Sequence, residues 1–413
     1  MNRNLSYIVL IVWLTIYIIF RQNILNYINQ NINIQLGSIE IEVLGGLVGY
    51  IIPILAFHFA KYLIYIINPN KKKYLKVLSN CRHWILSANE HWSSTYKGND
   101  RKIANSAEGL FSLIYTFDSI GQMEERIINE VAKYLIENVG ISGLKSFSFN
   151  KDTVQCTSLG LYVLSILRDK QLYKLSKEDA NKILLLYNAL INSKSKYGWA
   201  TLVEQEENSE RTRIMTTLWS IRAINAANLY NTNIVSDTVI YLISKIPSGK
   251  FGYTFSDHPK LCSTSLFIIL LFELKDENLK KEVFKLIDLK TIMDFIISEF
   301  VFKQNFIEFE DFDTKSMNLS GVEHLNYRHI SIGYALHAIS LYKKHLNFFQ
   351  RIVVNYRVKL IIKNNVNNDG YFFSTILATS KENPHIFPTI YFIEGLYYYI
   401  HDFLKKDSYN ESD

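Results

Sequence analysis

A pattern that recurs along the chain constrains its fold more than any other feature. The clearest copy is RTRIMTTLWSIRAINAANL, from Arg211 to Leu229. Large apolar residues such as Met215 and Trp219 are interspersed there with small ones such as Thr217 and Ala223. A helix of this composition is apolar around most of its circumference, so it must be buried on nearly all sides. The pattern therefore indicates a structural repeat and not a catalytic motif.

Five further segments share this design, at intervals of roughly 50 to 67 residues. They begin at Asn105 (NSAEGLFSLIYTF), Thr157 (TSLGLYVLSIL), Ser263 (STSLFIILLFEL), Ile330 (ISIGYALHAISLY) and Thr389 (TIYFIEGLYYYI). Helices that are buried on all sides need other helices to cover them. Amphipathic segments with charged faces fit that role at 124–137, 177–192, 237–245, 278–289 and 348–363. Each repeat is therefore predicted to be a pair of helices.

A glycine followed by an aromatic residue comes after several of the pairs, as at Gly198-Trp199, Gly252-Tyr253 and Gly370-Tyr371. Glycine permits a tight backbone at such a turn, and the ring can fill the seam between neighbouring repeats. Helix pairs with this period could stack as an open solenoid or close into a ring.

Two of these repeats resemble a known family. The segments KIPSGKFGYTFSDHPKLCSTSLFIILLFEL and NNDGYFFSTILATSKENPHIFPTIYFIEGLYYYI are similar to repeats of the squalene-cyclase and protein-prenyltransferase β-subunit superfamily. The resemblance covers about residues 100 to 405. It implies an all-α fold in which six helix pairs close as an (α/α)6 toroid, and it says more about fold than about activity.

The beginning of the chain is apolar in two places. Residues 5–20 carry no charge, and residues 43–67 are apolar apart from His58 and Lys61. A span of about 20 apolar residues crosses the hydrocarbon layer. Because no cleavage-site pattern follows Phe20, we expect a two-helix transmembrane hairpin rather than a signal peptide or two core helices.

Basic residues flank the two apolar stretches and predict their orientation. Arg3 precedes the first stretch and Lys71, Lys72 and Lys73 follow the second, which places both ends in the cytoplasm. The three cysteines are widely separated and match no disulfide framework, in agreement with a reduced compartment. The predicted location is the cell membrane, multi-pass, with the toroid in the cytoplasm.

Four regions follow from these patterns. Residues 1–70 are predicted to be the transmembrane hairpin, 71–100 a juxtamembrane linker helix, 101–405 the (α/α)6 toroid and 406–413 a flexible tail. The formal net charge of +6 comes partly from the juxtamembrane lysines, which favour an anionic lipid surface. The charge is therefore no indication of nucleic-acid binding by itself.

Basic residues gather where the buried helices begin. The amino-terminal ends of these helices converge at one mouth of a toroid and present unpaired N–H groups, which favour an anion. The residues at these ends are Arg101, Arg211, Arg213, His258, Lys260, His324, Arg328, His329 and His385. They could form a pocket for a phosphate-bearing ligand. Acidic neighbours such as Asp257 and Glu323 leave the alternative of scattered, solvated loop charges.

The resemblance also supplies two tests for catalysis. Protein prenyltransferases hold zinc with an Asp-x-Cys pair and a later His; Cys262 and His329 match, but Lys260 stands at the Asp position. Class II terpene cyclases use an Asp-x-Asp-Asp acid motif, and Asp311-Phe312-Asp313-Thr314 lacks the last carboxylate. No catalytic residue, metal or cofactor is therefore assigned, and catalysis is the less favoured class of function.

Two hypotheses remain. The favoured one is a membrane-anchored sensor or effector whose toroid binds an anionic small molecule or a short nucleic acid. It would act through its transmembrane hairpin, and because two spans cannot enclose a pore, it requires a homo-oligomer in the bilayer. The alternative is a membrane-tethered enzyme, similar to a prenyltransferase or a terpene cyclase, that acts on isoprenoid lipids.

Overall fold

The computed structural model describes most of the chain after residue 68. The described residues are 69–88, 92, 102–115, 122–146, 151–201, 203, 212–229, 233–302, 307–313, 322–328, 330–372 and 386–405. The chain divides into a unit Met1–Pro69 and a unit Asn70–Asp413, and the second is described below. Both stretches of the predicted transmembrane hairpin lie outside the described residues. None of the helices that the structure describes has the length and hydropathy that a bilayer span requires.

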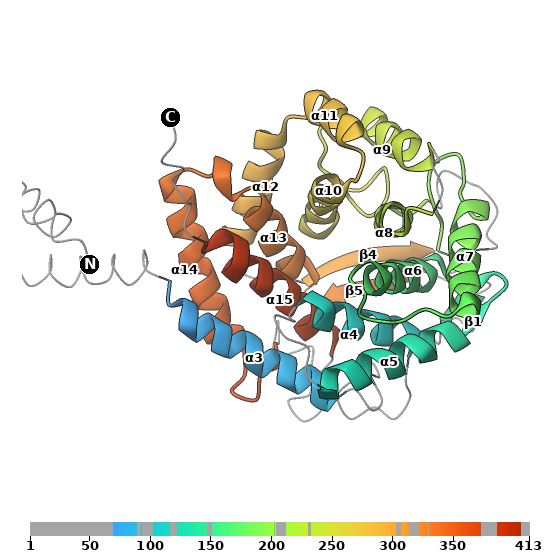
Figure 1. The fold of residues 1–413 in the computed structure, drawn as a ribbon. Helices are drawn as coiled ribbons and strands as arrows, with labels where there is room; N and C mark the ends of the chain where they lie inside the picture. The colour runs from blue at the N-terminus through green and yellow to red at the C-terminus, as the bar shows by residue number, and fades with distance from the viewer. Residues whose placement is uncertain are drawn as a thin grey trace, which may run out of the picture. The chain divides into compact units, whose positions relative to one another are not determined.

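Six helices form the inner ring of the second unit (Figure 1). They are α4 (Ile103–Tyr115), α6 (Val154–Asp169), α8 (Ile214–Ala227), α10 (Leu261–Glu273), α13 (Ile330–Leu341) and α15 (Phe387–Tyr398). Each packs against the next in this order, and α15 packs against α4, so the ring closes. All six coincide with the predicted copies of the repeat. In α8, 13 of the 14 residues are buried, as expected of a helix that is covered on all sides.

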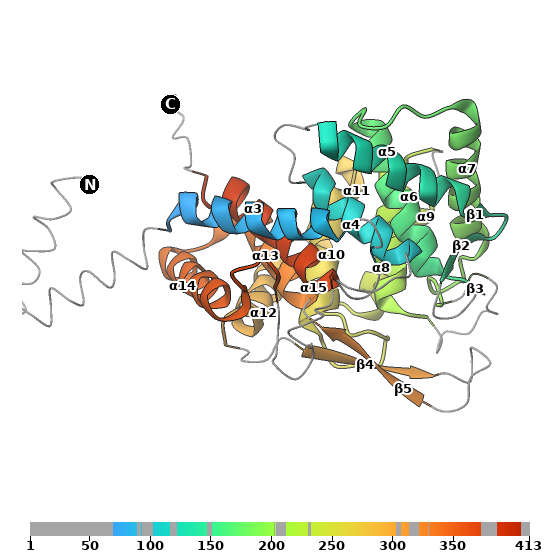
Figure 2. The same ribbon diagram turned by 90° about the horizontal axis from the view of Figure 1, so that it is seen from below.

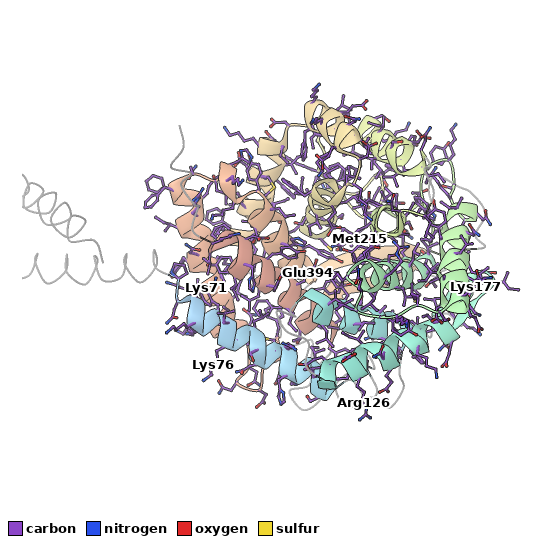
Figure 3. The ribbon with its side chains drawn as sticks, viewed as in Figure 1. Lys71, Lys76, Arg126, Lys177, Met215 and Glu394 are labelled. Carbon is purple, nitrogen blue, oxygen red and sulfur yellow. The ribbon has the colours of Figure 1, made fainter. Side chains whose placement is uncertain are left out.

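An outer layer of amphipathic helices surrounds this ring. Its members are α3 (Lys71–Ser87), α5 (Gln122–Glu137), α7 (Lys177–Asn192), α9 (Ile234–Lys245), α11 (Glu277–Leu286), α12 (Leu289–Phe302) and α14 (Phe348–Asn365). Charged side chains such as Lys76, Arg126 and Lys177 are exposed on them, whereas Met215 and Glu394 lie inside the ring (Figure 3). The hydrophobic core therefore lies between the two layers, and polar side chains such as Glu394 are enclosed by the inner ring.

Helix α3 belongs to this outer layer. Residues 71–100 are predicted to be a linker, yet α3 packs on α15 and α4 and buries Tyr74, Leu78, Cys81 and Trp84. The ring of Trp84 lies 5.5 Å from that of Tyr371. Because these contacts join the start of the described unit to its end, α3 helps to close the toroid.

A threonine near the start of four inner helices holds the preceding turn. The Thr217 hydroxyl accepts a hydrogen bond from the N–H of Trp199 (2.9 Å). The other three pairs are Thr157 with Leu144, Thr264 with Phe251, and Thr389 with Phe372. The predicted glycine turn at Gly198 has φ +138°, a value that side chains rarely adopt. Trp199 itself is fully buried, so its ring fills the seam between repeats.

Two glycines bring α13 and α15 into backbone contact. A Cβ atom at Gly333 would lie 2.1 Å from the carbonyl oxygen of Tyr391, and one at Gly395 would lie 2.6 Å from that of Gly333. Only glycine fits at such an approach. Tyr334 follows the first of these glycines and Glu394 precedes the second, and both belong to the site described below.

Short strands interrupt the helical pattern. Strands β1 (Val139–Gly140), β2 (Gly143–Ser146) and β3 (Lys151–Asp152) form a small antiparallel sheet before α6. Strands β4 (Ile307–Asp313) and β5 (Val322–Arg328) form a hairpin that leads into the amino-terminal end of α13. The hairpin crosses the centre of the ring in Figure 1 and lies on one side of it in Figure 2. The sequence predicts only a connecting segment here.

Candidate functional site

Three residues of the predicted anion pocket lie in the loops that lead into α8 and α10. Arg213 and Lys260 directly precede these helices. Main-chain hydrogen bonds from the segment 251–253 connect the starts of the two helices. Lys260 Nζ lies 5.9 Å from the centre of the Tyr253 ring. His258 is exposed in the same loop, whereas Arg213 is 8% exposed. The structure thus brings Arg213 and Lys260 to the same end of the ring.

The remaining residues of that prediction are spread differently. His324 and Arg328 lie in β5. In the strand register they stand opposite Asp311 and Ile307 of β4. Arg101, Arg211, His329 and His385 lie outside the described residues. The basic pocket and its anionic ligand therefore stay predictions.

Cys262, a possible zinc ligand in the sequence, is fully buried and its sulfur lies 3.9 Å from that of Met215. In the described part of the chain, no group of three or more His, Cys, Asp or Glu residues is placed to hold a metal ion.

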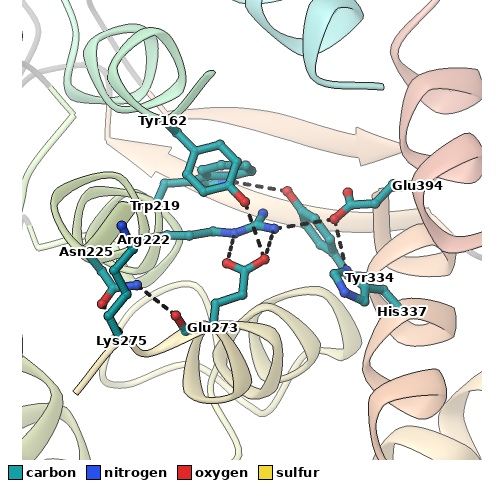
Figure 4. A network of polar contacts seen from close by, with 9 residues as sticks. All are labelled: Tyr162, Trp219, Arg222, Asn225, Glu273, Lys275, Tyr334, His337 and Glu394. Carbon is teal, nitrogen blue, oxygen red and sulfur yellow. Dashed lines mark hydrogen bonds and ion pairs between the residues drawn. The ribbon is translucent and has the colours of Figure 1, made fainter. Parts of the chain in front are cut away.

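A network of charged side chains occupies the centre of the ring instead (Figure 4). Arg222 of α8 donates hydrogen bonds to both carboxylate oxygens of Glu273 on α10, at 2.6 and 2.7 Å. Its Nη2 atom also lies 3.5 Å from the carboxylate of Glu394 on α15. Burial acts to lower the pKa of Arg222, but the charge of Glu273 raises it well above its ordinary value. The guanidinium therefore stays charged between two carboxylates.

Three aromatic rings surround this guanidinium. Its central carbon lies 4.6 Å from the ring centre of Tyr162, 4.7 Å from that of Trp219 and 5.4 Å from that of Phe111. The three rings meet edge to face, with centres 5.6 to 6.2 Å apart. Rings at these distances attract a cation through their quadrupoles. The three rings thus form an aromatic cage, contributed by α4, α6 and α8.

Glu394 also contacts a histidine. Its Oε1 atom lies 3.0 Å from Nδ1 of His337 on α13, and the His337 ring stacks on Tyr398 at a centre-to-centre distance of 3.5 Å. The side chains of Glu394 and His337 are 0% and 1% exposed. Two carboxyl groups, one guanidinium and one imidazole therefore share the ring centre.

A second group of polar side chains lies one helical turn away. The Tyr391 hydroxyl of α15 donates a 2.6 Å hydrogen bond to the carboxyl of Glu108 on α4. Burial raises the pKa of Glu108 from 4.5 to about 7, and the hydrogen bond from Tyr391 offsets only part of this shift. The ring of Tyr334 on α13 lies 5.1 Å from that of Tyr391, centre to centre, and the Tyr334 hydroxyl accepts a 3.1 Å hydrogen bond from Trp219 Nε1. Glu108 is therefore a buried carboxyl that keeps its proton to near neutral pH.

The two groups form two layers because their members are spaced three residues apart on four inner helices. The pairs are Glu108 and Phe111, Trp219 and Arg222, Tyr334 and His337, and Tyr391 and Glu394. Residues three apart lie on the same face of a helix. Each of these helices thus presents one aromatic and one ionisable side chain to the ring centre. This spacing is present in the sequence, whereas the predicted pocket lies at the ends of the helices.

A surface cavity of about 250 Å³ lies where α8 ends, near the end of α10. Its lining includes Asn225, Asn228, Asn233 and Lys275. Asn225 Nδ2 donates to the main-chain oxygen of Glu273, and Lys275 Nζ donates to that of Ala226. The cavity therefore borders Glu273 and does not include the buried layers.

Comparison with solved structures identifies the fold. No protein family and no curated protein matches the sequence. Solved structures of the type II terpene cyclase MstE from Scytonema are similar to this chain. Its complex with geranylgeranyl dihydroxybenzoate, described as its substrate, has a TM-score of 0.53 at 11% identity and covers 80% of this chain and 99% of that one. An apo form has a TM-score of 0.52 at 9% identity, covering 79% and 99%.

These similarities confirm the terpenoid cyclase-like toroid and correct the predicted function. The sensor or effector that acts through an oligomeric transmembrane hairpin is wrong, because the structures that share the fold are terpene cyclases, one with a prenylated substrate. The centre of the ring fits this correction, since it holds a buried acid and aromatic rings. The predicted homo-oligomer and lipid-bilayer partner stay predictions.

Proposed function

We propose that this chain is an enzyme that cyclises an isoprenoid chain by acid catalysis at the centre of its toroid. The observation that carries the proposal is the buried carboxyl of Glu108, whose pKa is raised to about 7 among aromatic side chains of the inner ring. A catalytic acid works best when its pKa lies near the working pH. Burial gives Glu108 this property.

The reaction begins with the transfer of a proton. The O–H bond of Glu108 breaks and a C–H bond forms at one carbon of a terminal double bond, which leaves a tertiary carbocation. The electrons of the next double bond then attack this cation and close a ring. Loss of a proton from the last cation completes the reaction, so the product is an isomer of the substrate. No cofactor or redox partner is required.

Aromatic rings would stabilise the cationic intermediates. Trp219, Tyr334 and Tyr391 lie in the same layer as Glu108, and the faces of such rings attract positive charge. The charge of Arg222 would oppose a carbocation, but Glu273 and Glu394 place two carboxylates against it. Arg222 therefore serves to hold the aromatic cage in position without making the centre of the ring positive.

The substrate class comes from the fold neighbour and from the chemistry. Geranylgeranyl dihydroxybenzoate is the substrate in the MstE complex. Purified full-length protein in detergent should convert this compound, or another geranylgeranylated aromatic acid, into a product of equal mass and shorter chromatographic retention. Glu108→Gln keeps the shape of the side chain and removes the acid, so it should abolish the conversion.

Two other carboxyl groups are competing candidates for the catalytic acid. Asp311→Asn and Asp313→Asn alter the acid candidates of the sequence analysis, which lie in β4. Loss of activity in either, with full activity in Glu108→Gln, would reject Glu108 as the acid. Absence of any isomer with all geranylgeranylated substrates would reject the proposed function.

The same proposal includes a membrane tether. The apolar stretches at 5–20 and 43–67 would hold the enzyme at a bilayer, where an isoprenoid lipid is dissolved. Extraction of membranes with alkaline carbonate tests this part separately. The protein should stay in the pellet, and its release into the supernatant would contradict a spanning tether.

A further inference from the structure

A tyrosine hydroxyl from the far end of the chain reaches the carboxyl of Glu108. The hydroxyl oxygen of Tyr391 lies 2.6 Å from Oε1 of Glu108, although 283 residues separate the two along the chain. Glu108 belongs to α4, the first helix of the inner ring, and Tyr391 to α15, the last. These two helices pack together where the ring closes, and both side chains are buried. The hydrogen bond therefore depends on closure of the ring.

Packing holds Tyr391 in place. Its main chain lies so close to α13 that a Cβ atom at Gly333 would be 2.1 Å from the Tyr391 carbonyl oxygen. Its ring meets the ring of Tyr334 edge to face, with 5.1 Å between the centres. The Tyr334 hydroxyl in turn accepts a 3.1 Å hydrogen bond from Trp219 Nε1. The main chain and the ring of Tyr391 are both constrained, which fixes the position of its hydroxyl.

This hydrogen bond makes the two carboxyl oxygens of Glu108 different. A protonated carboxyl has one hydroxyl oxygen and one carbonyl oxygen, and the carbonyl oxygen is the one that accepts. Because Oε1 accepts from Tyr391, the proton of the neutral acid belongs on Oε2. A donor also stabilises the ionised carboxylate more than the neutral acid, since hydrogen bonds to charged groups are the stronger ones. In agreement, the hydrogen bond from Tyr391 lowers the pKa of Glu108 against the larger effect of burial.

The charged groups of the elements that pack on α4 have other partners or are exposed. On α6, Arg168 pairs with Asp169, and the Tyr162 hydroxyl donates to Glu273. On α15, Glu394 contacts Arg222 and His337. Arg82 of α3 pairs with Glu124 of α5. The exposed residues of α3, α5 and β2 are Lys71, Lys72, Lys73, Lys76, His83, Glu125, Arg126, Glu130, Lys133, Glu137 and Lys145. All these groups are shared by wild type and by a variant of Tyr391, so the difference between the two isolates the hydrogen bond.

We propose that Tyr391 is the positioning residue of the catalytic acid: its hydroxyl holds Oε1 of Glu108, so that Oε2 carries the proton that is transferred. In the transfer, the O–H bond at Oε2 breaks and a C–H bond forms on the terminal double bond. The electron pair stays on the carboxylate, which the same hydroxyl stabilises. The proton that the last cation loses restores the acid in the overall balance. This role rests on the proposed function for the use that is made of the proton.

Tyr391→Phe removes the hydroxyl and keeps the ring. Tyr399→Phe is the matched control, because Tyr399 lies in the short π-helix η4 (Tyr399–Phe403) directly after α15 and is fully buried. Its hydroxyl also makes a 2.6 Å hydrogen bond, to Oδ1 of Asn355. Circular dichroism and thermal unfolding establish that both variants are folded. Difluorotyrosine at position 391 keeps the shape and is a stronger donor, so it tests the same bond even if Tyr391→Phe does not fold.

The first measurement needs no substrate. Infrared spectra of the full-length protein in detergent, recorded from pH 5 to pH 9, follow the carbonyl band of the protonated Glu108 carboxyl. Glu108→Gln identifies this band, since the variant lacks it. In wild type the band should disappear with a midpoint near pH 7, the pKa of Glu108.

Tyr391→Phe should raise this midpoint by about one pH unit, because the carboxylate loses a hydrogen bond that is stronger than that of the neutral acid. The band itself should move to higher wavenumber, since Oε1 has lost its donor. Difluorotyrosine should lower the midpoint, and Tyr399→Phe should change neither the midpoint nor the band. An unchanged or lower midpoint in Tyr391→Phe, or equal changes in Tyr391→Phe and Tyr399→Phe, would overturn the role of Tyr391.

The second measurement is the pH dependence of turnover. Because only protonated Glu108 can act, kcat/KM should fall as the pH rises through its pKa. In Tyr391→Phe this fall should occur about one pH unit higher, and the rate at low pH should be up to about tenfold lower, because a weaker acid transfers its proton more slowly. A fall at the wild-type pH would contradict the role of Tyr391. An enzyme without turnover would reject the proposed function, while the infrared titration would still test the hydrogen bond.

Discussion

Replacement of Glu108 by glutamine should remove a defined part of the pH dependence of stability. Burial raises the pKa of this carboxyl from 4.5 to about 7, so the folded chain holds the proton more tightly than the unfolded chain does. The resulting stabilisation is complete below pH 4.5 and is lost as the pH rises to about 7. Wild-type protein should therefore lose stability across this range relative to Glu108→Gln.

The size of this loss of stability follows from the size of the pKa shift of Glu108. One pKa unit corresponds to about 1.4 kcal/mol, so a shift from 4.5 to about 7 corresponds to about 3 kcal/mol in total. Between pH 5 and pH 8, about 2 to 3 kcal/mol of it should be lost. Both proteins share every other titrating group, so the difference between them isolates Glu108.

Urea unfolding of the full-length protein in detergent micelles, followed by circular dichroism at pH 5, 6, 7 and 8, measures this difference. Glu125→Gln, at an exposed position of α5, controls for the removal of a glutamate from the outer surface. The free energy of unfolding of wild type minus that of Glu108→Gln should fall as the pH rises. A constant difference, or one that increases with pH, would refute the reasoning.

Three further predictions concern packing and burial. Gly333→Ala should lower the free energy of unfolding by about 1 to 3 kcal/mol in urea titrations, because the added methyl group would meet the Tyr391 carbonyl. Thr217→Val leaves the N–H of Trp199 without its acceptor and should cost about 1 to 3 kcal/mol by the same assay. Cys81, whose pKa burial raises to about 12, should react with a thiol reagent only after unfolding. Stabilities equal to wild type, or labelling of native Cys81, would contradict them.

The helical architecture could be predicted because the inner helices are apolar on all sides. A helix with the pattern of 211–229 is stable only when it is buried on nearly all sides. Helix pairs that repeat with this period can pack in few ways, as an open solenoid or as a closed ring. The sequence could not show that α3 belongs to the outer layer of the toroid, because the polar surface of this helix is equally compatible with a linker. It also could not show the threonine contacts, since Thr217 and its equivalents look like ordinary small residues of a helix.

The sequence analysis does not predict the polar site at the ring centre, for a different reason. The prediction relied on the positive ends of helix dipoles and on basic residues nearby, which is a general rule for anions. A charged residue inside an otherwise apolar helix was the stronger signal, because burial of Glu108, Arg222 or Glu394 requires partners. The partner of each buried charged residue comes from a different repeat. Which residues pair therefore depends on how the ring closes, and the spacing of residues along the chain does not reveal it.

Transfer of a proton from Glu108 to an isoprenoid double bond is tested most directly by running the reaction in D2O. The full-length protein, equilibrated in D2O and given geranylgeranyl dihydroxybenzoate, should form an isomer that carries one deuterium on carbon at the initiating end of the chain, as detected by mass spectrometry and NMR. Glu108→Gln should form none. A product without carbon-bound deuterium, or equal labelling by Glu108→Gln, would contradict the account.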